Sequence, residues 1–215
     1  MQIFLDTADY DAIAKRYQTG LVSGITTNPT LVRKSGVNYV DFIKALATDF
    51  AFESISAEVE GESSFEMMCH ACKFRDIAEN VTIKLPLTQE GLIACKELTS
   101  QGVTTNVTLC FSVAQAVMAA LAGATYISPF VGRMNDNSFS GVELVRAIGG
   151  LYAAKRVETK VLAASLRDVH HVSRCLLYGA DVVTLPPAVF DKMYNHVLTD
   201  AGLAIFEKDF KEING

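Results

Sequence analysis

Eight short runs of apolar and β-branched residues recur at fairly even intervals, and each is followed by a longer segment with helical spacing. Alternation of strand and helix implies parallel pairing, because each helix carries the chain back to the starting edge of the sheet. The strands are expected near residues 2–7, 24–28, 54–60, 81–86, 104–109, 125–131, 160–165 and 181–185.

The segments between these runs have the length and spacing of crossover helices. In 63–79 and 89–101, apolar residues recur every three or four positions. The chain has 215 residues, and α/β barrels are single domains from about 200 residues upward. We therefore expect an α/β fold, a single (β/α)8 TIM barrel over residues 1–215 with an additional C-terminal helix over 196–215. An eight-stranded doubly wound sheet is the alternative.

Two nine-residue segments support a repeating architecture. GITTNPTLV begins at Gly24 and GVTTNVTLC at Gly102. Both place Thr-Thr-Asn within an expected strand, and the shared residues around it indicate equivalent βα units.

Charge and cysteine content limit the possible binding partners, cellular compartment and cofactors. The formal net charge is −5, so no general positive field would hold nucleic acid or an anionic membrane, and an anionic substrate would need a local basic site. The five cysteines are odd in number and scattered, without a leader sequence, which indicates a reduced, cytoplasmic compartment. Cys69 and Cys72 lack a second ligand pair, and the glycines form neither a G-x-G-x-x-G nor a Walker pattern, so we expect no metal and no cofactor.

The C-terminal segment carries an apolar stripe at helical spacing, formed by Leu203, Phe206, Phe210 and Ile213. This stripe must be buried. It can fold onto its own barrel or dock on a neighbouring subunit, and the stripe alone does not choose.

Polar residues inside buried parallel strands need an explanation, because such strands normally consist of Val, Ile and Leu. In a closed barrel these residues would gather at the carboxyl-terminal mouth, where barrel active sites lie. They are Asp6, Asn28, Glu58, Lys84, Asn106, Thr108 and Ser165.

Lys84 is the most informative of them, because the run VTIKLPL is apolar on either side. Desolvation disfavours an ammonium ion, so a buried lysine can supply a free amine that forms a Schiff base with a carbonyl. A structural lysine paired with a carboxylate is the alternative. Asp6 and Glu58 could supply the acid–base groups that this chemistry requires. Asp6 could instead close a turn before the first helix, with Asp9 as that helix's N-cap.

Arg133 and Arg167 lie just past the ends of the sixth and seventh expected strands, and Ser165 lies beside Arg167. Late βα loops commonly bind phosphate in barrels, and guanidinium groups bind it through paired donors. We expect a phosphate site here, with solvated surface arginines as the alternative.

Taken together, these motifs resemble the transaldolase family, specifically the short subfamily that also includes fructose-6-phosphate aldolase. The resemblance covers essentially the whole chain through FLDTA, GITTNPTL, ISAEV, VTIKLPLT, GVTTNVTLCFS, SPFVGR and LAASLR. It implies class I aldolase chemistry on sugar phosphates, with Lys84 as the Schiff-base nucleophile and Asp6 as the acid–base group. Glu58 and Thr108 would position a catalytic water. The implied substrate contacts are Thr26, Asn28, Asn106, Ser128, Phe130, Arg133, Ser165 and Arg167. The subfamily's ring-shaped decamers imply a homo-oligomer.

Three positions separate the activities within this subfamily, and one of them is Asn106, which the aldolase pattern lacks. The aldolase carries a tyrosine where this chain has Phe130 and a glutamine where it has Glu58. A phenol near the imine promotes the proton transfer that releases free dihydroxyacetone, and phenylalanine cannot. The resemblance therefore favours transaldolase, which transfers a dihydroxyacetone unit from sedoheptulose 7-phosphate or fructose 6-phosphate in the pentose phosphate pathway. A fructose-6-phosphate aldolase and a catalytically inactive sugar-phosphate-binding barrel are the alternatives.

Overall fold

The computed structural model describes residues 1–214 and contains eight parallel strands that close into a barrel in chain order. Pairing of β1 with β8, from Gln2 opposite Val182 to Leu5 opposite Leu185, closes the barrel. The expected (β/α)8 barrel is confirmed, and an open sheet is excluded. The strands are β1 (Gln2–Asp6), β2 (Gly24–Thr26), β3 (Ser54–Glu58), β4 (Val81–Pro86), β5 (Thr105–Cys110), β6 (Tyr126–Pro129), β7 (Lys160–Ala163) and β8 (Val182–Leu185).

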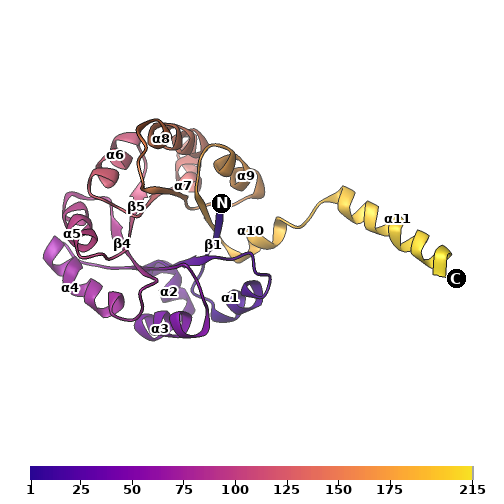
Figure 1. Ribbon diagram of the computed structural model, residues 1–215, viewed down its shortest axis with the longest axis horizontal. Helices are drawn as coiled ribbons and strands as arrows, with labels where there is room; N and C mark the ends of the chain where they lie inside the picture. The colour runs from indigo at the N-terminus through magenta and orange to yellow at the C-terminus, as the bar shows by residue number, and fades with distance from the viewer. Residues whose placement is uncertain (215) are drawn as a thin grey trace.

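Helices surround the strands as an outer ring (Figure 1). Most begin at a Ser, Thr, Asp or Asn side chain that accepts a backbone N–H, and the expected cap of the first helix by Asp9 is confirmed. The helices are α1 (Tyr10–Tyr17), α2 (Pro29–Ser35), α3 (Tyr39–Asp49), α4 (Ser64–Arg75), α5 (Gln89–Ser100), α6 (Val113–Leu121), α7 (Val131–Asp136), α8 (Gly141–Lys155), α9 (Val169–Leu177), α10 (Pro187–Lys192) and α11 (Val197–Asn214).

Alternation along each strand separates two cores. Side chains such as Leu5, Ile25 and Ile83 belong to a large apolar cluster shared with the helices. The neighbouring positions point into the barrel, where Phe4, Tyr126, Leu162, Ala164 and Val182 form a small separate cluster. Most polar strand residues share this inward face, so the helix-facing core is mainly apolar while the barrel interior carries hydroxyl, amide and charged groups.

Close packing inside the barrel requires a glycine in β2. Gly24 lies opposite Phe4, and a Cβ at Gly24 would lie 2.6 Å from the Phe4 ring. Glycine therefore allows this large ring to fill the barrel interior.

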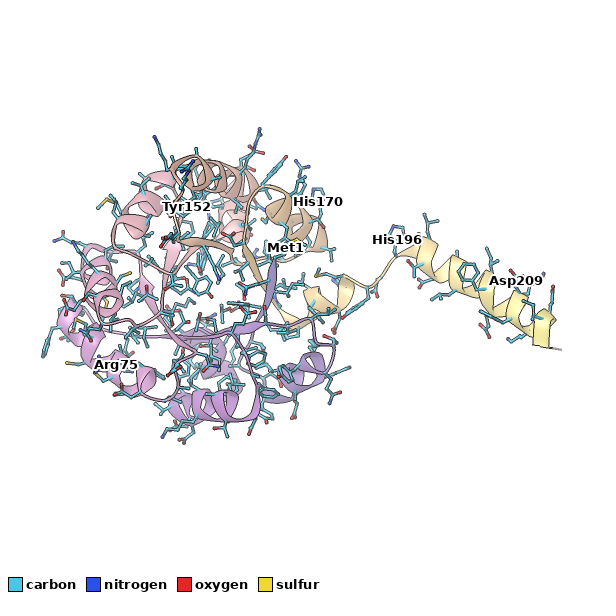
Figure 2. All side chains as sticks on the ribbon, viewed as in Figure 1. Met1, Arg75, Tyr152, His170, His196 and Asp209 are labelled. Atoms are coloured by element: carbon cyan, nitrogen blue, oxygen red, sulfur yellow. The ribbon has the colours of Figure 1, made fainter. Side chains whose placement is uncertain are left out.

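The C-terminal helix does not pack on its own barrel. Figure 1 shows α11 extending away from the ring of helices, and Figure 2 shows the side chains between His196 and Asp209 standing clear of it. Leu203, Phe206, Phe210 and Ile213 are all at least 60% exposed. Folding of the stripe onto its own subunit is therefore not what the structure shows. Within residues 1–214, no helix is long and apolar enough to cross a membrane.

Candidate active site

A small cavity of about 130 Å³ opens among the carboxyl ends of the strands. Ligand pockets typically measure about 300–1,000 Å³, so this cavity would enclose only part of a sugar phosphate. The remainder of such a ligand would lie at the mouth. The lining residues are Asp6, Thr26, Asn28, Lys84, Ser128, Phe130, Arg133, Ala164, Ser165 and Thr184.

Lys84 projects from β4 into the barrel and is 5% exposed. Its Nζ lies 2.7 Å from Glu58 Oε2 and donates to the Thr27 carbonyl oxygen over 3.0 Å. Glu58 stands opposite Lys84 in the register of β3 and β4. Lys84 is thus buried in the site, as expected for a reactive amine, and also paired with a carboxylate, as expected for a structural lysine.

Glu58 is the last residue of β3, and its backbone N–H donates to the Tyr39 hydroxyl over 2.7 Å. The side chain is 17% exposed. It borders a second hollow beside the barrel mouth, which Tyr39, His70 and Phe74 also line. Glu58 therefore stands between the lysine and a solvent-facing depression.

Asp6 ends β1 and faces the cavity. Its Oδ1 accepts a hydrogen bond from the Thr26 hydroxyl over 2.8 Å, and the Thr184 hydroxyl lies 2.7 Å from that of Thr26. Burial raises the pKa of the Asp6 carboxyl, although the charge of Lys84 and the Thr26 hydrogen bond act in the opposite direction. Asp6 is therefore a buried carboxyl that faces the cavity, and it does not close the turn before α1.

Asn106 and Ser128 form a buried polar pair on the opposite wall. The Ser128 hydroxyl donates to Asn106 Oδ1 over 2.7 Å, and Asn106 Nδ2 donates to Ser56 Oγ over 3.3 Å. Thr108 lies two residues further along β5, and its buried Oγ1 has no hydrogen-bond partner among the described residues. A buried hydroxyl without a protein partner is placed to bind water or substrate.

Asn28 and Ser165 lie in loops, although both were expected at the ends of strands. β2 ends at Thr26, and Asn28 serves as the N-cap of α2 by accepting the Leu31 N–H over 3.0 Å. β7 ends at Ala163, and Ser165 has a left-handed backbone with φ of 59°. Both residues still line the cavity, because the loop that follows a barrel strand opens at the same end.

The arginines lie at the rim in two different situations. Arg133 belongs to α7, lines the cavity and places its guanidinium carbon 4.9 Å from the centre of the Phe130 ring. Arg167 forms a two-fold hydrogen-bonded pair with Asp136, which lowers the pKa of that carboxyl. The side chain of Arg167 is 56% exposed, so it is available at the mouth but already has an anionic partner.

The loops that carry these arginines approach closely at Gly132. Its N–H donates to the Ser165 carbonyl oxygen over 3.0 Å. A Cβ there would lie 2.1 Å from that oxygen and 3.0 Å from both Ser165 Oγ and Arg167 Nε. Glycine therefore lets α7 bring Arg133 beside Ser165 and Arg167.

The structure thus brings Asp6, Thr26, Asn28, Lys84, Ser128, Phe130, Arg133 and Ser165 to one cavity, with Glu58 in contact with Lys84. Asn106 adjoins this group through Ser128, while Arg167 lies beside it at the rim. The sequence analysis missed Thr27, Tyr39 and Thr184. Thr184 carries the same signal as the others, a polar residue in a buried strand, whereas nothing in the sequence marks Tyr39. Within residues 1–214, no three His, Cys, Asp or Glu side chains are grouped as metal ligands.

Comparison with known proteins shows what the chain as a whole is similar to. The family model described as transaldolase/fructose-6-phosphate aldolase matches residues 3–214. A protein of Caulobacter sp. (strain K31) named probable transaldolase is 50% identical over 210 residues, covering 98% of this chain and 96% of the relative. One from Dinoroseobacter shibae with the same name is 48% identical over 212 residues, covering 99% and 97%. A third, from Leptospira biflexa serovar Patoc, is 46% identical over 214 residues, covering all of both chains.

Proposed function

The chain belongs to the transaldolase/fructose-6-phosphate aldolase family, and from this premise we propose that it is a transaldolase that acts through a Lys84 Schiff base. It transfers a dihydroxyacetone unit from a ketose phosphate, such as sedoheptulose 7-phosphate or fructose 6-phosphate, to an aldose phosphate. The observation that carries this proposal is the buried Lys84 amine between Glu58 and the Thr27 carbonyl, in a cavity shared with Asp6.

The first half of the reaction forms the imine. Glu58, 2.7 Å from Nζ, takes the proton that the Lys84 ammonium must lose before it attacks the ketose carbonyl. The amine adds to this carbon, and loss of water gives the imine. Glu58 and the unpaired Thr108 hydroxyl hold the water that leaves and later returns for hydrolysis.

The second half exchanges the aldehyde. Asp6 takes the proton of the hydroxyl next to the breaking carbon–carbon bond, so that the departing fragment becomes an aldehyde and its bonding electrons remain on the imine-linked three-carbon unit. The raised pKa of Asp6 suits a group that takes this proton and returns it when the acceptor aldehyde forms the new bond.

Substrate recognition divides between the cavity and its mouth. Thr26, Asn28, Asn106 and Ser128 would bind sugar hydroxyls, and Phe130 would form an apolar wall. Arg133, Ser165 and Arg167 would bind the phosphate, which requires that the phosphate share or replace Asp136 at Arg167. A net charge of −5 for the whole chain is compatible with such a local basic site.

Acceptor dependence distinguishes transfer from simple aldol cleavage. With fructose 6-phosphate and erythrose 4-phosphate, we expect steady formation of sedoheptulose 7-phosphate and glyceraldehyde 3-phosphate. Without an acceptor, release of glyceraldehyde 3-phosphate should stop after one equivalent per active site. Cleavage that proceeds equally fast without acceptor would instead assign the chain an aldolase activity, which the names of its relatives do not favour.

Replacement of Phe130 tests the same distinction from within the site. Phe130→Tyr introduces a phenol into the cavity wall near Lys84, where it can protonate the bound three-carbon unit. We expect free dihydroxyacetone to form at least about 10 times faster than in the wild type, the order of gain that a placed proton donor provides. Phe111→Tyr, on the neighbouring ring 5.8 Å away, is the control and should leave this rate unchanged.

We further propose that the protein works in the cytoplasm, in the non-oxidative pentose phosphate pathway, as a homo-oligomer. All five cysteines are free, which fits a reducing compartment. The exposed apolar stripe of α11 supports docking on a neighbouring copy of the chain, and a decamer is the expected assembly.

A further inference from the structure

We propose that Tyr39 is a positioning residue for the Lys84 reaction, because its hydroxyl binds both residues that contact the lysine amine. Tyr39 is the first residue of α3, and its ring packs 4.9 Å from that of Phe74. Its hydroxyl reaches the Glu58 N–H at 2.7 Å and the Thr27 hydroxyl at 2.6 Å. The inference rests on the proposed function, since it concerns the same lysine.

The hydroxyl interrupts the backbone pairing between the ends of β2 and β3. Thr26 pairs with Ser56, and the Thr27 N–H continues the ladder by donating to the Ser56 carbonyl over 3.2 Å. In a regular parallel ladder the next bond would run from the Glu58 N–H to the Thr27 carbonyl. Here the Glu58 N–H donates to Tyr39 instead, and the Thr27 carbonyl accepts from Lys84 Nζ over 3.0 Å. Tyr39 thereby leaves a backbone acceptor free for the lysine.

The hydrogen-bond partners of the Thr27 and Tyr39 hydroxyls determine where the proton of each hydroxyl points. The Thr27 hydroxyl has one proton, and it donates this proton to the Ser56 carbonyl oxygen over 2.8 Å. The Tyr39 hydroxyl must therefore donate to Thr27 Oγ1 while it accepts from the Glu58 N–H. Burial raises the pKa of Tyr39 to about 12, so the hydroxyl keeps this proton at neutral pH. Its orientation is fixed by one donor and one acceptor.

Loss of the Tyr39 hydroxyl should lower the reactivity of Lys84 more than it weakens substrate binding. In Tyr39→Phe the Glu58 N–H can complete the ladder to the Thr27 carbonyl, where it competes with Lys84 Nζ for the same oxygen and shifts the end of β3 that carries the Glu58 carboxylate. The rim residues Arg133, in α7, and Ser165, in the loop after β7, should keep their contacts.

The test compares Tyr39→Phe with Tyr152→Phe. Tyr152 also has a buried hydroxyl, which donates to the Ala116 carbonyl over 2.6 Å between α8 and α6 in the outer layer (Figure 2). We expect Tyr39→Phe to lower kcat for dihydroxyacetone transfer about 10- to 100-fold, because a small misplacement of reacting groups is costly. KM for fructose 6-phosphate should stay within about twofold, and the rate of borohydride trapping on Lys84 should fall with kcat. Tyr152→Phe should keep the wild-type kcat.

Thr27→Val provides a second, independent variant, because it removes the acceptor that orients the Tyr39 hydroxyl. It should lower kcat without raising KM, and the double variant should be no slower than the slower single variant, as expected for residues acting as one unit. Wild-type kcat in Tyr39→Phe, or a rise in KM at constant kcat, would overturn the inference. Should Tyr39→Phe fail to fold, Thr27→Val decides by the same criteria. A wild-type protein that neither transfers nor is trapped on Lys84 would overturn the proposed function itself, and the role of Tyr39 with it.

Discussion

At the scale of single residues, the notable feature is a charged pair inside a barrel. Lys84 and Glu58 are largely removed from water and lie 2.7 Å apart. Desolvation of two charges offsets most of their attraction, so an apolar pair of similar volume would serve stability as well or better. The proposed Schiff-base chemistry at Lys84 gives a reason for retaining this pair that stability does not supply. Asp6 fits the same explanation, because burial disfavours its ionised form in the folded protein.

Asp6→Asn should therefore lower the activity while it raises the stability of the protein. The pKa of Asp6 is raised on folding from its ordinary value of 3.8, so the folded protein retains a proton that the unfolded chain has already released. The free energy of unfolding of the wild type consequently falls as pH rises through this window. At pH 8, Asp6→Asn should unfold at a higher temperature than the wild type, and a gain of about 1 kcal/mol would raise Tm by roughly 2–4 °C. The difference should shrink as pH approaches 3.8.

The same variant should lose at least about 100-fold in turnover, because it has no acid–base group. Asp9→Asn is the matched control, since asparagine also caps helices well and the Asp9 side chain lies at the N-terminus of α1. Thermal unfolding followed by circular dichroism and the coupled transfer assay measure the two effects. A less stable Asp6→Asn at pH 8, or one with full turnover, would contradict the role assigned to this carboxyl.

The sequence identified the site residues where one physical rule was sufficient. A polar side chain in a buried strand marked Asp6, Lys84, Asn106 and Glu58, and all four lie on the inward face near the carboxyl end of the barrel. The rule does not identify Tyr39, because its contact with Glu58 depends on how α3 crosses the end of β3. Nor does it identify the partner of Arg167, since nothing in the spacing of Asp136 indicates that the two side chains meet.

At the scale of elements, the loops after the strands decide where the recognition groups lie. The strands were located correctly, but several are shorter than predicted. One reason is that cap residues such as Asn28 end the strand segment and accept a backbone N–H of the next helix. Ser165 lies two residues past the end of β7 and has a left-handed backbone. The close contact of α7 with the loop after β7 then brings Arg133, Ser165 and Arg167 to one rim.

Gly132→Ala tests this contact between elements. The added methyl group would lie 2.1 Å from the Ser165 carbonyl oxygen, so α7 and the loop must separate. We expect a loss of about 1–3 kcal/mol in stability, as for other overpacked sites, and a KM for fructose 6-phosphate that rises about 10-fold or more, as loss of one phosphate contact would cause.

Gly150→Ala is the control, because Gly150 lies inside α8 and an added Cβ would have no atom within 4 Å other than those of the adjacent helix backbone. Alanine there should stabilise the protein by roughly 0.5–1 kcal/mol through helix propensity and leave KM unchanged. Urea denaturation and steady-state kinetics of both variants provide the comparison. A Gly132→Ala protein with unaltered KM would show that the close approach does not position the phosphate contacts.

At the scale of the whole molecule, the barrel completes its own core and the last helix does not contribute to it. The stripe of α11 was predicted from spacing alone, but its location depends on what lies beyond one chain, which no periodicity within that chain can specify. Large exposed apolar patches on a helix are uncommon in monomers. The exposed phenylalanines Phe206 and Phe210 therefore support the proposed docking of α11 on a second copy of the chain.

Phe206→Glu/Phe210→Glu should disrupt this assembly. Light scattering of the wild type should give a mass that is a multiple of the 23.3 kDa chain, and the double variant should shift toward 23.3 kDa because its carboxylates cannot be buried in an apolar contact. Lys208→Ala, on another face of the same helix, should keep the wild-type mass. A wild type at 23.3 kDa, or an unchanged mass in the double variant, would exclude α11 as the interface.

Borohydride reduction in the presence of fructose 6-phosphate tests the central claim, Schiff-base transfer by Lys84, most directly. Peptide mass spectrometry should find the reduced three-carbon unit on Lys84 of the wild type and of Lys160→Ala, whose lysine lies at the opposite end of the barrel in β7. Lys84→Arg and Lys84→Ala should carry no label and show no transfer, because neither offers a nucleophilic amine. Absence of label in the wild type, with ligand-dependent thermal stabilisation alone, would identify a sugar-phosphate-binding barrel. Labelling that survives Lys84→Ala would contradict the mechanism.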